Sequence, residues 1–406
     1  MKISKLSVTS LFFFLILLAA ALKDDLEAIT SSEYWSELSI HPAISFLKSS
    51  SYVLLIMAGI IGFFIIIRTK HLSIRISSAS TILLALTLVS GMRATYFDMN
   101  AAFKLFQAFA LTLFIILVGG RLTSDCGITQ IKQKLANAFF IFSATFIVIN
   151  AMNVAFGYGF APNNPRFFGT ATHPNFIGSQ LAICNIIVAA RIISSNFARF
   201  RQYIASIILL SGGIPALLLT GSRTAFLMFI VGTSVLWLSK RKFKVDIWLL
   251  AALLTFFSLL MFVIFQADID SAFYRGEGGT NTRSDVWISM INLIIDNPWF
   301  GYGYFIENSE NSYLRSMIAF GIPFGIALSS VVLLCTVKLF KLSWNNRKFP
   351  DKPEHLFFAL MLALLMGGIF EGFLIDSWSL PKLTFILLTV ATITSSNHQH
   401  QHLNQK

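Results

Sequence analysis

Charged residues are scarce in this sequence. Asp, Glu, Lys and Arg together make up 12% of the 406 residues, whereas hydrophobic residues make up 55%. A soluble protein of this length needs a more polar surface, and apolar runs of about 18 or more residues recur along the chain. The composition therefore excludes an ordinary soluble enzyme and predicts a polytopic membrane protein.

Cysteine is nearly absent as well. The three cysteines, Cys126, Cys184 and Cys335, are far apart and form no CxxC pair, so neither a disulfide framework nor a thiol site is indicated. The net charge of +12 comes from short basic clusters between apolar runs, which is a pattern of membrane topology and not of nucleic-acid binding.

The motifs of metal and nucleotide chemistry are missing too. The sequence has no HExxH and no GxxxxGK[ST], so nucleotide-driven transport is not expected. Asp268 and Asp270 have a DxD-like spacing, but we interpret them as solvated loop acids beside a helix end. We therefore expect neither a metal nor another cofactor.

The apolar runs predict an all-α membrane protein with about twelve transmembrane helices in a single integral membrane domain, residues 1–406. The first run is interpreted as an uncleaved helix, because no small-x-small cleavage site with a soluble domain follows it. The runs fall near residues 8–22, 51–67, 77–92, 103–119, 136–155, 174–190, 203–219, 224–238, 246–266, 312–336, 356–372 and 380–396.

The connections between these runs alternate in charge. Most Lys and Arg residues fall in one alternate set of connections, and most Asp and Glu residues fall in the other set. The positive-inside rule then predicts that both termini are cytoplasmic. One outer connection, residues 267–311 between helices nine and ten, is much longer than the others. It contains a candidate interfacial helix, residues 284–296, capped by Ser284 and closed by Asn297-Pro298.

Three predicted outer segments carry arginine: PNNPRFFGTATHPN, LLLTGSRTAFL and YRGEGGTNTRSDVW. A single outer arginine can simply anchor lipid phosphate. The TGSR turn, however, is too short to rise far from the membrane, so Arg223 is expected to stay in an outer vestibule, where charge is costly and usually functional. Arginine also suits bidentate contact with phosphate, so convergence of these arginines would make a diphosphate site. The polar candidates in the three segments are Arg166, His173, Asn175, Arg223, Arg275 and Arg283.

A fourth polar stretch, ENSENSYLRSMIAFG, spans residues 307–321 and opens the tenth predicted helix. It places Glu310 and Asn311 directly before apolar sequence. Acids and Asn suit a helix N-terminus, so both residues could be caps alone. The other interpretation is that they act on a substrate at the outer face.

Together these features resemble the superfamily of O-antigen ligases and polymerases. The resemblance is carried by about twelve helices, LTGSR at the start of helix eight, and R-x3-W followed by NPWFGYG in the long loop. A polar pair opening helix ten completes it. Its motifs cover residues 130–340, and its topology covers the whole chain.

The resemblance implies metal-independent glycosyl transfer at the periplasmic face of the bacterial inner membrane. The donor would be a glycan on undecaprenyl diphosphate. Arg223 and Arg283 would hold the diphosphate, Arg166 is a third contact and Arg275 is a reserve candidate. Membrane lipids, and for a polymerase a flippase and a chain-length regulator, would be its partners.

The ligases of this superfamily place His before an Asn, Ser or Gln that is followed by nine residues and Gly. Asn311 and Gly321 match this pattern, but Glu310 stands in the position of the histidine. A carboxylate can also serve as the general base. His173 is an alternative base, although a structural role at the start of helix six fits it better.

The departure at Glu310 favours a polymerase of O-antigen or exopolysaccharide repeat units. The alternative within the superfamily is a ligase that moves glycan to lipid A-core or to protein. From another class, a lipid-glycan transporter or flippase fits less well, because such folds usually repeat their halves and place polar residues near the bilayer midplane.

Overall fold

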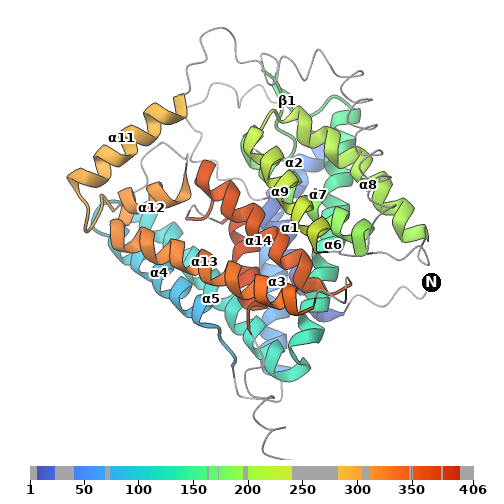
Figure 1. Ribbon diagram of the computed structural model, residues 1–406, viewed down its shortest axis with the longest axis horizontal. Helices are drawn as coiled ribbons and strands as arrows, with labels where there is room; N and C mark the ends of the chain where they lie inside the picture. The colour runs from blue at the N-terminus through green and yellow to red at the C-terminus, as the bar shows by residue number, and fades with distance from the viewer. Residues whose placement is uncertain are drawn as a thin grey trace, which may run out of the picture.

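The computed structural model describes residues 7–22, 41–68, 74–161, 164–171, 173–194, 200–239, 282–303, 311–346, 349, 351–375 and 378–393. Helices dominate this part of the chain, and one short antiparallel hairpin accompanies them (Figure 1). The elements are α1 (Val8–Leu22), α2 (Pro42–Ser49), α3 (Ser51–Arg68), α4 (Ser78–Ala94), α5 (Met99–Cys126), α6 (Ile128–Ala155), β1 (Phe160–Ala161), β2 (Asn164–Phe167), α7 (Pro174–Ser194), α8 (Phe200–Leu219), α9 (Arg223–Leu238), α11 (Thr282–Asp296), α12 (Ser312–Phe320), α13 (Ile322–Asn345), α14 (Pro353–Phe370) and α15 (Leu380–Ala391).

Seven of the described helices are long and apolar enough to cross a membrane: α3, α5, α6, α7, α8, α13 and α14. Several further apolar helices, α1, α4, α9 and α15 among them, are shorter. The predicted class, an all-α polytopic membrane protein, is confirmed. The number of about twelve spans stays a prediction, and the ninth predicted helix, residues 246–266, lies outside the described residues.

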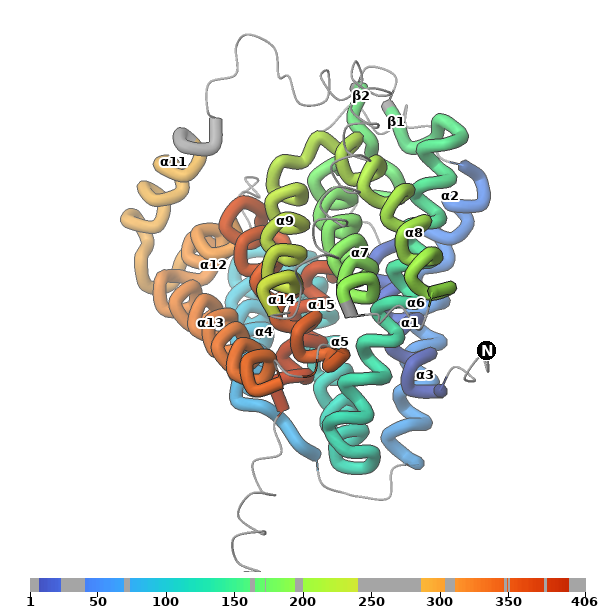
Figure 2. The backbone as a smooth tube through the Cα atoms, turned by 45° about the vertical axis from the view of Figure 1, so that its right-hand side comes forward, coloured from blue at the N-terminus to red at the C-terminus, as the bar shows by residue number. Residues whose placement is uncertain are grey.

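Helix α7 lies at the centre of the bundle. It packs against α6, α8, α9 and α14, and 83% of its apolar 18-residue segment is buried. By contrast, only 22% of the corresponding segment of α3 is buried, because α3 lies at the edge of the bundle and exposes a broad apolar face. In Figure 2, the hairpin β1–β2 lies at one end of the bundle, above α7 and α8.

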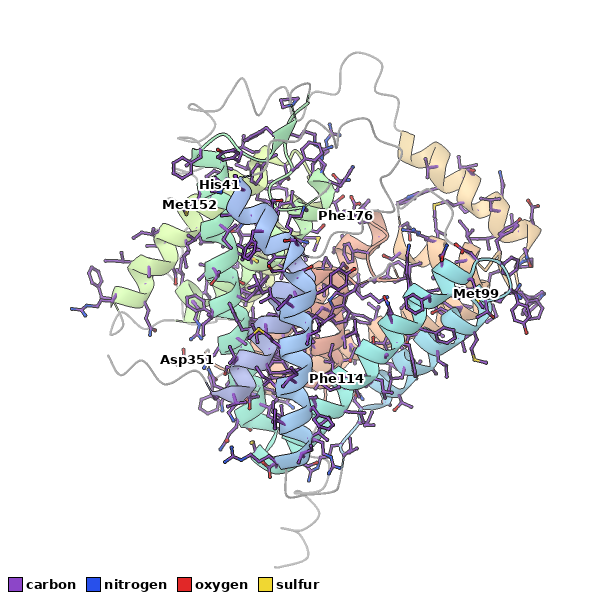
Figure 3. The ribbon with its side chains drawn as sticks, turned by 180° about the vertical axis from the view of Figure 1, so that it is seen from behind. His41, Met99, Phe114, Met152, Phe176 and Asp351 are labelled. Carbon is purple, nitrogen blue, oxygen red and sulfur yellow. The ribbon has the colours of Figure 1, made fainter. Side chains whose placement is uncertain are left out.

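Helices α7 and α14 begin at opposite ends of the bundle. Phe176, in the first turn of α7, lies toward the end that carries the hairpin, whereas Asp351, just before α14, lies toward the other end (Figure 3). The two helices pack against each other. The last residues of α14 therefore meet the first residues of α7, and this meeting point positions the candidate site.

The tenth predicted helix, residues 312–336, is wrong as one continuous helix. The chain forms α12 up to Phe320, breaks at Gly321 and continues as α13. Gly321 has a φ of 91°, which side chains rarely adopt, and a proline follows in the first turn of α13. The predicted interfacial helix also differs at its start, since α11 begins at Thr282 and Ser284 lies inside it.

The NPWFGYG segment packs along α12. The amide of Tyr302 donates to the carbonyl of Ile318 (2.8 Å), that of Gly303 to Ala319 (2.6 Å), and that of Ile322 to Pro298 (2.7 Å). Positive φ at Gly301 and Gly303 allows this close approach of two backbones. The glycines thus serve main-chain packing around α12.

Helix α11 packs on α12 with one face and exposes another. Met290 and Ile294 form a small core with Ile318 of α12. On the other face, Ile288 and Ile295 are 58% and 67% exposed, with Ile291 between them. An exposed apolar stripe of this kind is typical of a helix that lies in a membrane interface.

Gly321→Ala is expected to destabilise the protein by about 1–3 kcal/mol, because the new Cβ would meet the backbone of Trp299 and φ is positive. The matched control is Gly59→Ala in α3, where nothing lies within 4 Å of the added Cβ. Chemical unfolding of both variants in micelles measures the difference. Equal stability of the two variants would contradict the tight packing at Gly321.

Candidate functional site

Arg166 lies in β2, and buried neighbours fix its strand. The hairpin pairs Phe160 with Phe167, and Asn150 of α6 accepts a hydrogen bond from the amide of Thr170 (3.2 Å). Glycines allow the chain to fold tightly at both ends of the hairpin. Arg166 itself is half-buried.

The Arg166 guanidinium reaches two other elements. Its Nε donates to the carbonyl of Thr220 (2.8 Å), in the turn between α8 and α9, and its Nη2 donates to Oδ1 of Asn175 in α7 (2.8 Å). The structure therefore brings two of the three predicted arginine segments together.

The TGSR turn is built from its own hydroxyls. Thr220 Oγ1 donates to Leu217 O (2.7 Å), and Ser222 Oγ accepts from the amide of Ala225 (3.3 Å) as the N-cap of α9. Arg223 is consequently the first residue of α9, and its side chain is exposed. The short turn places Arg223 three residues after Thr220, whose carbonyl binds Arg166.

His173 performs the structural role that the sequence favoured. Its Nδ1 accepts a hydrogen bond from the amide of Asn175 (3.2 Å), directly before α7 begins at Pro174. Its ring also lies against Phe176, with 5.5 Å between the ring centroids. Because Nδ1 is used in this bond, His173 is a poor choice for the general base.

Glu371, which the sequence analysis did not single out, is the third member of the cluster. It follows α14 directly, is 4% exposed, and its Oε1 accepts a hydrogen bond from Nδ2 of Asn175 (3.2 Å). Its signal in the sequence was a lone carboxylate at the end of a long apolar run. The motifs of the resemblance end near residue 340, so they did not direct attention to it.

The start of α12 is hydrogen-bonded to the backbone of Glu371 and of the residues that follow it. Ser312 Oγ donates to the carbonyl of Glu371 (2.6 Å) and accepts from the amide of Leu374 (3.2 Å). Asn311, immediately before, is buried and caps α12, since its Oδ1 accepts from the amides of Tyr313 (3.0 Å) and Leu314 (3.1 Å). Asn311 therefore caps α12, and its role toward a substrate stays a prediction.

Helix α11 reaches the cluster through an aromatic contact. Trp287, the tryptophan of R-x3-W, stacks on Phe370 at the end of α14, with ring centroids 6.1 Å apart and an interplanar angle of 28°. The backbone of Arg283 lies one turn earlier in α11. This contact therefore brings the helix of the third arginine segment close to Glu371.

Tyr313 is unsuited to act as a base in this region. It lies in α12, outside the seven candidate spans, and burial raises the pKa of its phenol to about 12. The hydroxyl consequently remains protonated at neutral pH. It lies close to Gly368 of α14, where an added Cβ would be 3.4 Å away.

The electrostatics of the cluster favour an anion. The N-termini of α7, α9 and α12 all meet there, as the bonds of Asn175, Thr220 and Ser312 show. Helix N-termini carry partial positive charge and bind phosphate groups readily. Together with Arg166, and with Arg223 as the first residue of α9, these termini are expected to make the surface of the cluster positive around the buried carboxyl group of Glu371.

Other predicted site residues lie beyond what the structure describes. Glu310 and Arg275 lie outside the described residues, as do residues 267–281 and 304–310 of the predicted loop 267–311. The side chain of Arg283 is not described either. In the described part of the chain, no group of three or more His, Cys, Asp or Glu could hold a metal ion. The catalytic and binding roles of all these residues stay predictions.

Asn311→Ala is expected to lower the free energy of unfolding by about 1–2 kcal/mol, because it removes a helix cap and places alanine at a φ of 84°. Asn311→Gly accepts this φ, so the expected loss is only a few tenths of a kcal/mol. Chemical unfolding in micelles separates the two variants. An alanine variant as stable as the glycine variant would contradict the capping role.

One family model matches part of the chain. The family model described as O-antigen ligase matches residues 205–328, less than half of the chain. This segment begins in α8, includes the TGSR turn and ends in α13. No curated protein gives a match.

The family implies a membrane protein that takes a lipid-linked glycan donor and a glycan acceptor. It thereby indicates glycan transfer of the O-antigen ligase or polymerase type. The resemblance drawn from the sequence is confirmed by this match: residues 205–328 are similar to the O-antigen ligase family.

Proposed function

We propose that this protein polymerises O-antigen or exopolysaccharide repeat units at the periplasmic face of the bacterial inner membrane. The growing glycan on one undecaprenyl diphosphate is transferred to a sugar hydroxyl of another lipid-linked unit. The observation that carries the proposal is the meeting of Arg166, the TGSR turn and three helix N-termini. The TGSR turn and the start of α12 lie in the family-matched residues 205–328.

The diphosphate of the donor binds at this positive surface. Arg166 and Arg223 contact its oxygens, together with Arg283 from α11 and Arg275 in reserve. These charges stabilise the negative charge that develops on the leaving group as the glycosidic C–O bond breaks. The lipid diphosphate leaves with the electron pair of that bond and stays in the membrane.

The acceptor is activated at the start of α12. Its hydroxyl oxygen forms the new bond to the anomeric carbon, and Glu310 takes the hydroxyl proton. Asn311 holds the N-terminus of α12 beside this acceptor. The chain's own residues thus supply charge stabilisation and a base, without a metal or another cofactor. A flippase would deliver the repeat units, and a chain-length regulator would limit the product.

A ligase is the second candidate, because the spacing from Asn311 to Gly321 matches the ligase pattern. The two functions differ in acceptor, which is lipid A-core or protein for a ligase. Glycans extracted from a deletion strain distinguish them. Single repeat units on the final acceptor, with no ladder, indicate a lost polymerase, whereas long chains that remain on undecaprenyl diphosphate indicate a lost ligase.

Arg223→Ala is expected to reduce the glycan ladder by about 100-fold or more in the complemented deletion strain, because it removes charge stabilisation of the leaving group. Arg201→Ala is the matched control, since Arg201 is also exposed but lies at the opposite end of α8. It should restore the ladder at equal protein level. Similar ladders from both variants would argue against a diphosphate site at the TGSR turn.

Glu310→Gln is expected to abolish the ladder, and Glu310→His to restore part of it, since imidazole can replace a carboxylate as the base. Protein levels are matched by immunoblot, and ladder length and amount are compared on gels. A normal ladder from Glu310→Gln would contradict the role of Glu310 as the base and leave only the role of a helix cap.

A further inference from the structure

A buried carboxylate at the end of an apolar helix requires an explanation. Glu371 is 4% exposed, and removing a carboxylate from water is costly unless it is hydrogen-bonded and near positive charge. Its Oε1 receives the Asn175 amide, which connects it to the Arg166 guanidinium. One hydrogen bond that compensates for burying Glu371 therefore comes from a group that also holds Arg166 of the proposed donor site.

The two ends of the Asn175 amide bind different partners. Its Oδ1 accepts from Arg166, and its Nδ2 donates to Glu371. The opposite orientation of the amide would place its NH₂ against the guanidinium and its oxygen against the carboxylate, and both contacts would be repulsive. The charge of Glu371 thus fixes the amide, and the amide fixes one edge of the guanidinium.

The backbone of Glu371 holds a second element. Its carbonyl accepts from Ser312, and the same hydroxyl accepts from the amide of Leu374. Ser312 is fully buried and is the first residue of α12. Glu371 is therefore connected to the donor-side arginine through Asn175, and to the acceptor-side helix through its own backbone carbonyl.

We propose that Glu371 is a positioning residue, which orients Arg166 through Asn175 for the donor diphosphate and holds the start of α12 beside it. This inference rests on the proposed function. Glu371 does not itself touch the substrate; it acts by keeping two elements in register. If Glu371 loses its charge, the hydrogen bond from Asn175 can still form. The Asn175 amide, however, no longer prefers the orientation that points its oxygen at Arg166.

The test measures binding of undecaprenyl diphosphate to the full-length protein in nanodiscs by native mass spectrometry. Glu371→Gln keeps the shape and an acceptor oxygen, so it isolates the charge. It is expected to weaken binding about threefold to tenfold, because a neutral acceptor no longer favours one orientation of the Asn175 amide; the size is that of one typical net hydrogen bond. In an Arg166→Ala background, the same change should have no further effect, because coupled residues are not additive.

Glu354→Gln is the matched control for loss of a buried carboxylate from α14. Glu354 lies in the first turn of that helix, paired with Lys132 (3.2 Å), far from the hairpin end. Its loss should lower the melting temperature without changing the affinity for undecaprenyl diphosphate. Glu371→Gln should instead lower the affinity for undecaprenyl diphosphate, with a smaller effect on the melting temperature.

Two outcomes would overturn the inference alone: unchanged binding by Glu371→Gln, or an equal loss with and without Arg166. If the wild-type protein itself fails to bind undecaprenyl diphosphate, the proposed function fails and the inference fails with it. Should Glu371→Gln prove too unstable to purify, Asn175→Leu, which breaks the same connection from α7, must show the same lack of additivity with Arg166→Ala.

Discussion

One chain of hydrogen bonds, from Arg166 through Asn175 to Glu371, determines how the hairpin end of the bundle is organised. It connects β2, α7 and the end of α14, and the neighbouring bonds of Thr220 and Ser312 add the starts of α9 and α12. In a nearly uncharged bundle, each of these groups would be costly to bury alone. Together they satisfy one another, so elements from distant parts of the sequence must meet at this point.

The second constraint is geometric and concerns the two ends of α12. Asn311 and Gly321 both have positive φ, at 84° and 91°, and the nine residues between them are the nine residues of α12. The spacing that carries the resemblance is therefore the length of one short helix. Because this spacing describes backbone geometry, it can be kept while the preceding residue changes from histidine to glutamate.

Hydropathy and turn residues predicted the class of the fold and several helix starts, because apolar length and capping are local properties. The cap at Asn311, the structural position of His173 and the end of α11 before Asn297-Pro298 all follow from them. The break at Gly321 did not, since hydropathy does not report φ. Glu371 was missed because its importance arises from contacts with residues about 200 positions away, which no local pattern contains.

The exposed stripe of Ile288, Ile291 and Ile295 on α11 has a consequence for how the protein meets its substrate. A helix with such a face lies at the level of the lipid headgroups, and α11 is attached to the site through Trp287 and Phe370. The phosphates of the proposed donor would lie in that layer, so the donor would reach the site by lateral diffusion within the bilayer. Under the proposed function, the donor concentration that matters would be molecules per area of membrane, and a lipid that is scarce in the cell as a whole would suffice.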